Sequence, residues 1–179
     1  EVPFQMDIER IVLSEMIDHG EHLKAIHAIP LSLRRFYIQA YQSFIFNQSL
    51  SSAFSDGENL FEAQAGDVCF DFKGIIGKYV KGMDQYLALP FVGYSYYKKT
   101  RFDYQISKIL QAEEIAPKDF FIKEMQEVSN EGGFRQAAIH CTDYSSHDDV
   151  VEFSLSRGSF ATILLREIMK PKNPMTAGF

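Results

Sequence analysis

The first thirty residues have the apolar spacing of two short helices. Apolar side chains follow Asp7 at intervals of three and four residues, and Gly20 provides a stop. A second short helix is expected over residues 21–29, with Pro30 ending it. The apolar stripe of the first helix consists of Ile8, Ile11, Val12, Met16 and Ile17. This pattern predicts an α-hairpin.

A longer helix is predicted over residues 33–54. Ser32 can cap its start, apolar residues recur on nearly every turn, and Asp56 and Gly57 end it. The apolar positions are Phe36, Tyr37, Ala40, Tyr41, Phe44, Ile45 and Leu50. We expect this to be the most buried helix of the chain.

Two runs after the long helix have the pattern of β-strands. Residues 67–73 alternate apolar and polar side chains, which suits a half-buried strand. Residues 86–92 form a second apolar run, in which Pro90 marks an edge or an exit. A small sheet packed on the long helix is therefore expected.

The second half of the chain changes from helices to a hairpin. Amphipathic spacing predicts helices over residues 102–113 and 118–127, separated by Pro117 and closed by the double glycine at Gly132 and Gly133. Strands are then expected over residues 134–143 and 150–155, joined by a polar turn at 145–149.

A last helix is predicted over residues 159–170, with Ser159 as its N-cap and Pro171 ending it. The elements together give the α+β class. A mainly helical domain with a small sheet is expected over residues 1–133, and a β-hairpin with a helix over residues 134–179.

The composition is typical of a soluble globular protein, with 46% hydrophobic and 23% charged residues and no apolar run near the roughly 20 residues that span a bilayer. The chain begins without an initiator Met or a signal peptide, which indicates a piece cut from a longer protein. Cys69 and Cys141 cannot form a disulfide framework and fit a reducing cytoplasm, so we interpret them as small apolar residues.

The net charge of −6 argues against a generic nucleic-acid binder, but the charge is unevenly distributed. Residues 73–101 hold six cations and the single anion Asp84, a balance of +5, which leaves −11 for the rest of the chain. Tyrosines among the cations offer stacking surfaces beside phosphate-neutralising charges, although a solvated loop with core tyrosines would give the same pattern. The tyrosines are Tyr79, Tyr86, Tyr94, Tyr96 and Tyr97.

Two longer runs carry a family resemblance. Residues 40–47 read AYQSFIFN, and residues 158–167 read GSFATILLRE. In this order they resemble the AYQSxxFN helix and the GSFATxxLRE element of the TruD family of tRNA pseudouridine synthases. Residues 131–135 (EGGFR) and 89–94 (LPFVGY) also lie where archaeal-type members place similar residues.

The resemblance covers nearly the whole chain and implies a domain arrangement. In the family, a domain named for TruD is inserted into a pseudouridine synthase catalytic fold. Residues 1–133 resemble most of that inserted domain. Residues 134–179 resemble the segment that returns to the catalytic domain.

Two motifs of the family are absent from these 179 residues. They are GxKD, whose aspartate is the nucleophile, and NxFGxQRFG, and we expect both in a segment that precedes Glu1. Asp143, Asp148 and Asp149 do not replace the nucleophile, because aspartates in a polar turn usually serve the turn itself.

The chemistry implied by the resemblance defines what the site must hold. Breaking the glycosidic bond, rotating the uracil and rejoining it through carbon requires a positioned carboxylate, an aromatic surface and a shielded pocket. The target base must also leave its stack, at a cost of a few kcal/mol. No metal or redox cofactor is needed, and His19, His22, His27, His140 and His147 lack the further ligands of a zinc site.

The C-terminal motif supplies the candidate active-site lining. By motif match, Phe160 is expected to line the uracil pocket, and the backbone N–H groups of Gly158 and Ser159 could meet a phosphate or a carbonyl. The alternatives are an ordinary core aromatic and an ordinary helix start. Arg166 and Glu167 are interpreted as structural.

Candidate RNA contacts are spread over three segments, although single arginines are usually only solvated. The candidate RNA-binding residues are Arg34, Arg35, Lys78, Lys81, Lys98, Lys99, Arg101 and Arg135.

On the long helix, Tyr41, Gln42 and Asn47 match the family pattern but are interpreted as structural. A buried amide is commonly satisfied by the backbone of a nearby loop.

Two functions remain open from the sequence. In the first, the chain is part of an enzyme that isomerises a tRNA uridine, at position 13 as the family implies, with tRNA and the preceding catalytic segment as its partners and no membrane association. The chain alone is then inactive. In the second, it is a non-enzymatic module that binds RNA or protein.

Overall fold

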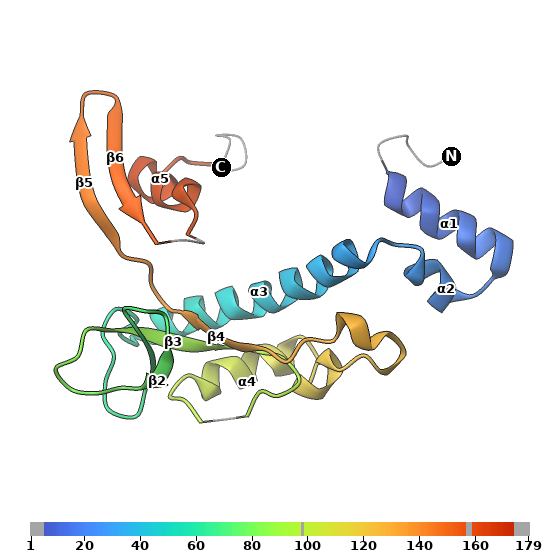
Figure 1. Cartoon of the computed structure of the whole chain (residues 1–179), viewed down its shortest axis with the longest axis horizontal. Coiled ribbons are helices and arrows are strands. Elements are labelled where there is room, and N and C mark those ends of the chain that lie inside the picture. Colours follow the sequence, from blue (N-terminus) through green and yellow to red (C-terminus); the bar gives the residue numbers. More distant parts are fainter. Residues whose placement is uncertain (1–5, 98, 157–158, 174–179) are drawn as a thin grey trace. The chain divides into compact units, whose positions relative to one another are not determined.

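The chain divides into two compact units in the computed structural model, which describes residues 6–97, 99–156 and 159–173 (Figure 1). The division falls after Ala137, slightly later than the expected boundary at residue 133. Residues 133–137 belong with the first unit because their strand joins its sheet and because the Ala137 N–H donates to the Leu87 carbonyl at 2.9 Å. The mixture of helices and small antiparallel sheets confirms the α+β class.

The predicted α-hairpin is present at the start of the first unit. Helix α1 spans Asp7–His19 and helix α2 spans His22–His27. Gly20 ends α1 in the left-handed region, with φ of 67° and its N–H bonded to the Met16 carbonyl at 2.9 Å. None of the residues of α1 is buried, so its apolar stripe is only partly covered.

The long helix α3 spans Leu31–Ser55 and contains more buried residues than any other described helix. All of them lie in its C-terminal two thirds, and they are Gln42, Ile45, Phe46, Ser49 and Ala53. The expectation that this is the most buried helix is confirmed among the described helices, although Phe36, Tyr37 and Phe44 of its apolar stripe are exposed. The predicted cap by Ser32 was wrong, since the helix begins at Leu31, two residues before the predicted start, and its cap residue Pro30 makes no side-chain cap bond.

A four-stranded antiparallel sheet packs on α3, as expected. Its order is β2 (Ile76–Lys78), β1 (Val68–Asp71), β3 (Gln85–Phe91) and β4 (Gly133–Gln136). Strand β2 was not predicted. The missed signal was Asp71, whose Oδ1 accepts the N–H groups of Lys73 and Ile75 at 2.8 Å and folds the chain back on itself.

Pro90 lies inside β3, at a position where its lack of an N–H costs the sheet no hydrogen bond. The Leu87 carbonyl faces β4, so Leu89 and Phe91, at alternate positions, face β4 as well. Pro90 faces the opposite side, beyond the last residue of β3 that pairs with β1. The strand is therefore central in its first half and an edge in its second half, as the proline indicated.

Helix α4 spans Asp103–Ala112, in agreement with the prediction, but the next predicted helix is replaced by two 3₁₀ turns. These turns, η1 and η2, span Pro117–Phe120 and Lys123–Val128. The backbone between them is extended because the Ile122 N–H donates to the Ser129 Oγ at 2.8 Å. A tertiary contact therefore replaces the local helical bonds.

The core of the first unit lies between α3, α4 and the sheet. Its side chains come from elements far apart in sequence and form one continuous cluster. The buried members include Ile45, Phe46, Leu87, Leu89, Phe91, Phe102, Ile106, Leu110 and Phe120.

The second unit is a hairpin of β5 (Cys141–His147) and β6 (Val150–Leu155), followed by helix α5 (Ala161–Met169). The single strand expected over residues 134–143 was wrong, since β4 and β5 are separate strands in different sheets. The predicted cap by Ser159 was also wrong, because Phe160 occupies the cap position and makes no side-chain cap bond. None of the described helices is both long and apolar enough to cross a membrane.

Candidate nucleic-acid interface

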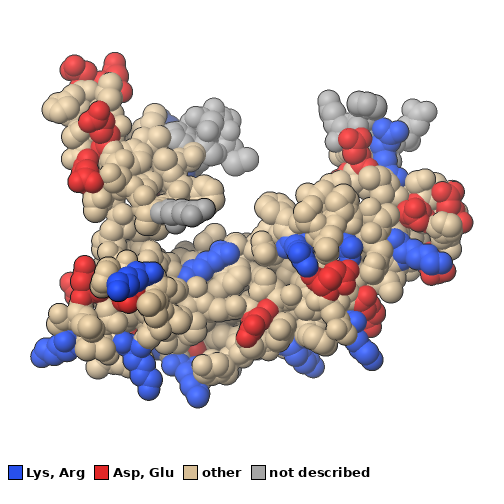
Figure 2. Space-filling model, in the orientation of Figure 1, with Lys and Arg blue, Asp and Glu red and all other residues tan. Residues whose placement is uncertain are grey.

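Exposed lysines accompany exposed apolar side chains at the β1–β2 end of the sheet. Lys78 lies in the edge strand β2, Lys81 lies in the turn that follows, and both are exposed. The Lys73 Nζ lies 5.4 Å from the centre of the Phe72 ring, which is 74% exposed. Figure 2 shows basic side chains projecting over this end of the molecule. The surface therefore combines cations with apolar side chains, of which Ile75, Ile76, Val80 and Met83 are further exposed members.

The tyrosines of the basic stretch differ in what they can contact. Tyr97 is exposed, and the Lys99 Nζ lies 4.9 Å from its ring centre. Tyr96 instead donates its hydroxyl to Asp103 Oδ1 at 2.8 Å. Burial, and then this hydrogen bond, raise the pKa of the Tyr96 phenol. Tyr97 is thus available as a stacking surface, whereas Tyr96 is part of the fold. Lys98 lies outside the described residues.

Arg101 is held by the loops around it. Its Nε donates to Asp67 Oδ1 at 3.0 Å, its Nη1 pairs with Glu58, and its Nη2 donates to the Asn59 carbonyl at 2.9 Å. Its side chain is only 17% exposed and lies over the Phe102 ring. These contacts explain Arg101 structurally, and its assignment to RNA binding stays a prediction.

Arg135 and Arg34 are also engaged within the first unit. The Arg135 guanidinium stacks 3.6 Å from the centre of the Phe91 ring and donates to the Ser43 Oγ at 3.0 Å, and burial lowers its pKa. Arg34 is 11% exposed and donates to the Ile29 carbonyl and to Glu127 Oε1. Their assignment to RNA binding likewise stays a prediction.

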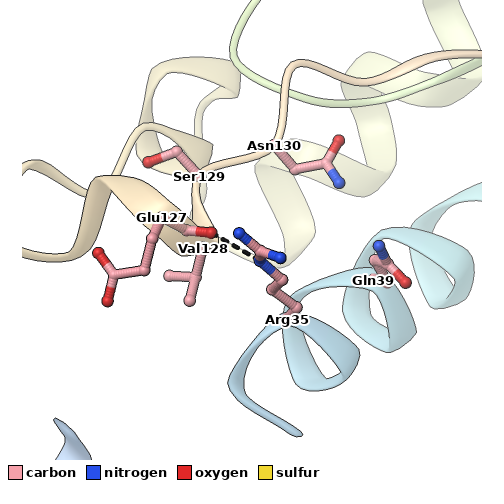
Figure 3. Close-up of a pocket in the computed structure, with 6 residues that line it drawn as sticks. All are labelled: Arg35, Gln39, Glu127, Val128, Ser129 and Asn130. Carbon is pink, nitrogen blue, oxygen red and sulfur yellow. Dashed lines mark hydrogen bonds between the residues drawn. The ribbon is translucent and has the colours of Figure 1, made fainter. Parts of the chain in front are cut away.

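Arg35 differs from Arg34 because it lines an open pocket of about 300 Å³ (Figure 3). Its Nε donates to the Glu127 carbonyl oxygen at 2.9 Å. Gln39, one turn further along α3, and Asn130, in the loop before β4, line the same pocket. The remaining lining residues are Glu127, Val128 and Ser129.

The loop that carries Asn130 is fixed by a close backbone contact. A Cβ atom at either Gly93 or Gly132 would collide with backbone atoms of the other segment, so only glycines allow the two chains to lie this close. The Asn130 carbonyl accepts the Tyr94 N–H at 3.0 Å, and the Asn130 Oδ1 accepts the Gly132 N–H at 2.9 Å. The Asn130 side chain is thereby oriented toward the pocket by its own loop.

The carboxylate at the rim of this pocket is already neutralised. Arg34 Nη1 lies 2.6 Å from Glu127 Oε1. A backbone hydrogen bond at Glu127, and then the bond from Arg34, lower the pKa of the Glu127 carboxyl. Figure 3 shows this carboxylate directed away from the Arg35 guanidinium. The positive charge of Arg35 is therefore the unpaired one in this pocket.

Gln39 and Asn130 were missed by the sequence reasoning. A signal existed for Gln39, which lies four residues after Arg35 on one face of a predicted helix. Asn130 precedes the double glycine, but its orientation depends on Gly93, 37 positions earlier, and could not be foreseen.

The long-helix motif has the structural role that was expected for Gln42. This residue is fully buried and its Nε2 donates to the Val92 carbonyl at 2.7 Å, which confirms a backbone partner in an adjacent segment. Tyr41 donates its hydroxyl to Glu113 Oε2 at 2.9 Å. Asn47 is exposed.

The C-terminal motif presents its aromatic ring to the surface. Phe160 is 71% exposed and immediately precedes α5. The Ser159 Oγ lies 3.0 Å from the Ser156 Oγ, which steadies this corner. Gly158 lies outside the described residues. Within the described ranges, no three His, Cys, Asp or Glu side chains are grouped as a metal site.

Comparison with known proteins identifies the family. The family model described as tRNA pseudouridine synthase D (TruD) matches residues 1–168. The chain belongs to the TruD family. Two relatives, from Pyrobaculum islandicum and Pyrobaculum neutrophilum, are each named "Probable tRNA pseudouridine synthase D" and are 31% and 33% identical over 175 residues. Each alignment covers 96% of this chain and 42% of the relative, so the TruD chain spans less than half the length of these proteins.

The TruD fold is supported by a solved structure. A crystal structure from Methanosarcina mazei, whose title names tRNA pseudouridine synthase D (TruD), superposes with a TM-score of 0.81. The match covers 97% of this chain and 46% of that one, at 24% identity. The family match confirms the resemblance stated from the two motifs, and this superposition confirms the fold.

Proposed function

We propose that this chain is part of a tRNA pseudouridine synthase that isomerises a uridine, at position 13 of the tRNA, to pseudouridine. The observation that carries the proposal is the family match over residues 1–168, which includes both motif runs and ends within α5. The chain supplies RNA contacts and one wall of the active site. A longer protein of the length of the relatives supplies the nucleophilic aspartate.

The reaction assigns a role to Phe160. The N1–C1′ bond of the uridine breaks and a C5–C1′ bond forms, so a proton leaves C5 and another is taken up at N1. An aromatic face holds the detached uracil while it rotates. Phe160 is exposed in this chain and is free to serve as that face, with Gly158 and Ser159 beside it in sequence.

Residues 1–133 are proposed to form most of the inserted domain and residues 134–179 the returning segment of the catalytic domain. The exposed ring of Phe160 supports this assignment, because a core aromatic of an independent domain would be covered. In the second unit the helix α5 also has no fully buried residue. The preceding part of the longer protein is therefore proposed as the partner of this unit.

Release of tritium from 5-tritiated uridine in tRNA tests the catalytic proposal, because forming the C5–C1′ bond expels the tritium. The full-length protein should release tritium, and the 179-residue chain should release none. Turnover by the chain alone would overturn the account of the missing aspartate. Phe160→Ala should abolish release by the full-length protein while leaving the stability of the 179-residue chain within about 0.5 kcal/mol, since the ring is largely exposed.

We propose that Lys78 and Lys81, at the β1–β2 end of the sheet, bind tRNA together with Lys98 and Lys99. Replacing these lysines by Glu should weaken tRNA affinity and flatten its dependence on salt, by about 0.7–0.9 in the log–log slope for each phosphate that is no longer neutralised. Lys108→Glu and Lys118→Glu are matched controls, because both lysines are exposed and lie in other elements. An unchanged affinity and slope in the lysine variants would reject this surface as an RNA-binding surface.

The alternative, a non-enzymatic module that binds RNA or protein, makes a different prediction for the same assays. The exposed apolar side chains beside the lysines are the observation that favours it. In that case tRNA binds the full-length protein without tritium release.

A further inference from the structure

We propose that the pocket between α3 and the loop before β4 binds one backbone phosphate of the RNA, through Arg35, Gln39 and Asn130. This inference rests on the proposed RNA-binding function and adds a site to it. The three residues come from two segments of the first unit and line the same opening (Figure 3).

The pocket presents hydrogen-bond donors that have no protein partner. The Arg35 guanidinium uses only its Nε, toward the Glu127 carbonyl, which leaves both Nη groups without a partner among the described residues. Gln39 makes no side-chain hydrogen bond within the same set. The Asn130 Oδ1 is occupied by the Gly132 N–H, and this fixes the amide so that Nδ2 is the free end.

The acceptors around these donors are mostly engaged. Asn130 Oδ1 accepts from Gly132, the Glu127 carbonyl accepts from Arg35, and the Glu127 carboxylate is paired with Arg34. The Ser129 Oγ accepts the Ile122 N–H. A ligand that only accepts hydrogen bonds matches such a site, and a phosphate group in RNA is an acceptor with a negative charge.

A phosphate fits better than a base. None of the six lining residues is aromatic, so a base would find no ring on which to stack. The single unpaired charge is that of Arg35, because Arg34 and Glu127 neutralise each other. One phosphate therefore satisfies both the charge and the donors.

Isosteric variants test the pocket by measuring tRNA affinity with the 179-residue chain. Asn130→Asp keeps the Oδ1 that accepts the Gly132 N–H but replaces the free donor with a charged acceptor, and Gln39→Glu makes the same change on an exposed helix surface. Each should weaken tRNA binding about tenfold or more, because a hydrogen bond to a charged group is lost and a repulsion is added. Arg35→Gln should weaken binding and lower the salt slope by about 0.7–0.9.

Two control variants separate the pocket from a general effect of charge. Gln48→Glu introduces the same charge nine residues further along α3, on the opposite face of the helix, and Lys108→Gln removes one exposed cation from α4. Both should bind tRNA as the unmodified chain does. Circular dichroism of every variant confirms that it is folded.

The outcomes distinguish the pocket from the wider function. The pocket assignment is wrong if Asn130→Asp and Gln39→Glu bind tRNA as well as the control Gln48→Glu does. It is also wrong if these two variants and the control lose affinity equally. Neither result bears on the proposal that the lysines bind tRNA. If the unmodified chain shows no affinity for tRNA, both the pocket and the RNA-binding role of this chain are rejected.

Discussion

Substitution of Gly93 by Ala should disrupt the backbone contact that orients Asn130. The added methyl group would overlap backbone atoms of Asn130, Glu131 and Gly132. Backbone atoms cannot rotate away as a flexible side chain can, so the two segments must separate. The glycine itself does not have a positive φ, and the effect is therefore one of space.

The expected magnitude combines overpacking with weakened hydrogen bonds. Overpacking of a well-packed site costs about 1–3 kcal/mol. Separation of the segments also weakens the bonds from the Tyr94 N–H, the Ser95 N–H and the Ser95 Oγ to the loop carbonyls, at about 1 kcal/mol each. We expect a loss of about 3–5 kcal/mol, a large part of the stability of about 5–15 kcal/mol that is usual for a domain.

Urea unfolding and amide hydrogen exchange measure this loss. The urea midpoint of Gly93→Ala should fall strongly, and the amides of Tyr94 and Ser95 should exchange faster. Gly77→Ala is the matched control, because no heavy atom lies within 4 Å of its added Cβ, and it should change stability by about 0.5 kcal/mol at most. Equal urea midpoints for the two variants would refute the close contact.

Two further predictions concern ionisable groups of the first unit. Arg101→Ala leaves the buried Asp67 without its guanidinium partner and should lower the free energy of unfolding by about 2–3 kcal/mol, as measured by thermal unfolding. The control Lys108→Ala should cause no such loss. Equal losses in the two variants would contradict a stabilising role of the ion pair. Burial and the bond to Asp103 raise the pKa of Tyr96, so the stability that this phenol contributes is complete below its unfolded pKa of about 10 and is lost as the pH rises toward the folded value. The urea midpoint should therefore fall less between about pH 8 and about pH 11 in Tyr96→Phe than in the unmodified chain. An identical fall in both would show that the Tyr96 phenol is not the group responsible.

Local patterns predicted most helices of this chain because those helices are formed by local bonds. The expected bounds of α4 and of the long helix differ from the observed ones by one or two residues. The expected helix over residues 118–127 failed because the Ile122 N–H bonds to Ser129 rather than to a preceding carbonyl. Apolar periodicity contains no information about such a tertiary bond.

The prediction of strands was limited in the same way, because sequence patterns are local and strand pairing is not. Residues 150–155 were predicted with the observed bounds, since alternation is local. The predicted strand over residues 134–143 joined β4 and β5, because the assignment of each to a different sheet depends on partners elsewhere in the chain. Of the candidate site, Arg35 was predicted as a cation at the start of the long helix, whereas Gln39 and Asn130 became visible only when the structure brought α3 and the loop before β4 together.

The short edge strand β2 has a consequence for the solubility of the chain. All three of its residues, Ile76–Lys78, are exposed, and its outer edge offers unpaired backbone groups to any other extended chain. A lysine on such an edge opposes strand pairing between molecules, because its charge would have to be desolvated. Replacing Lys78 by an apolar residue should therefore promote self-association, while Lys78→Glu removes the positive charge and still protects the edge.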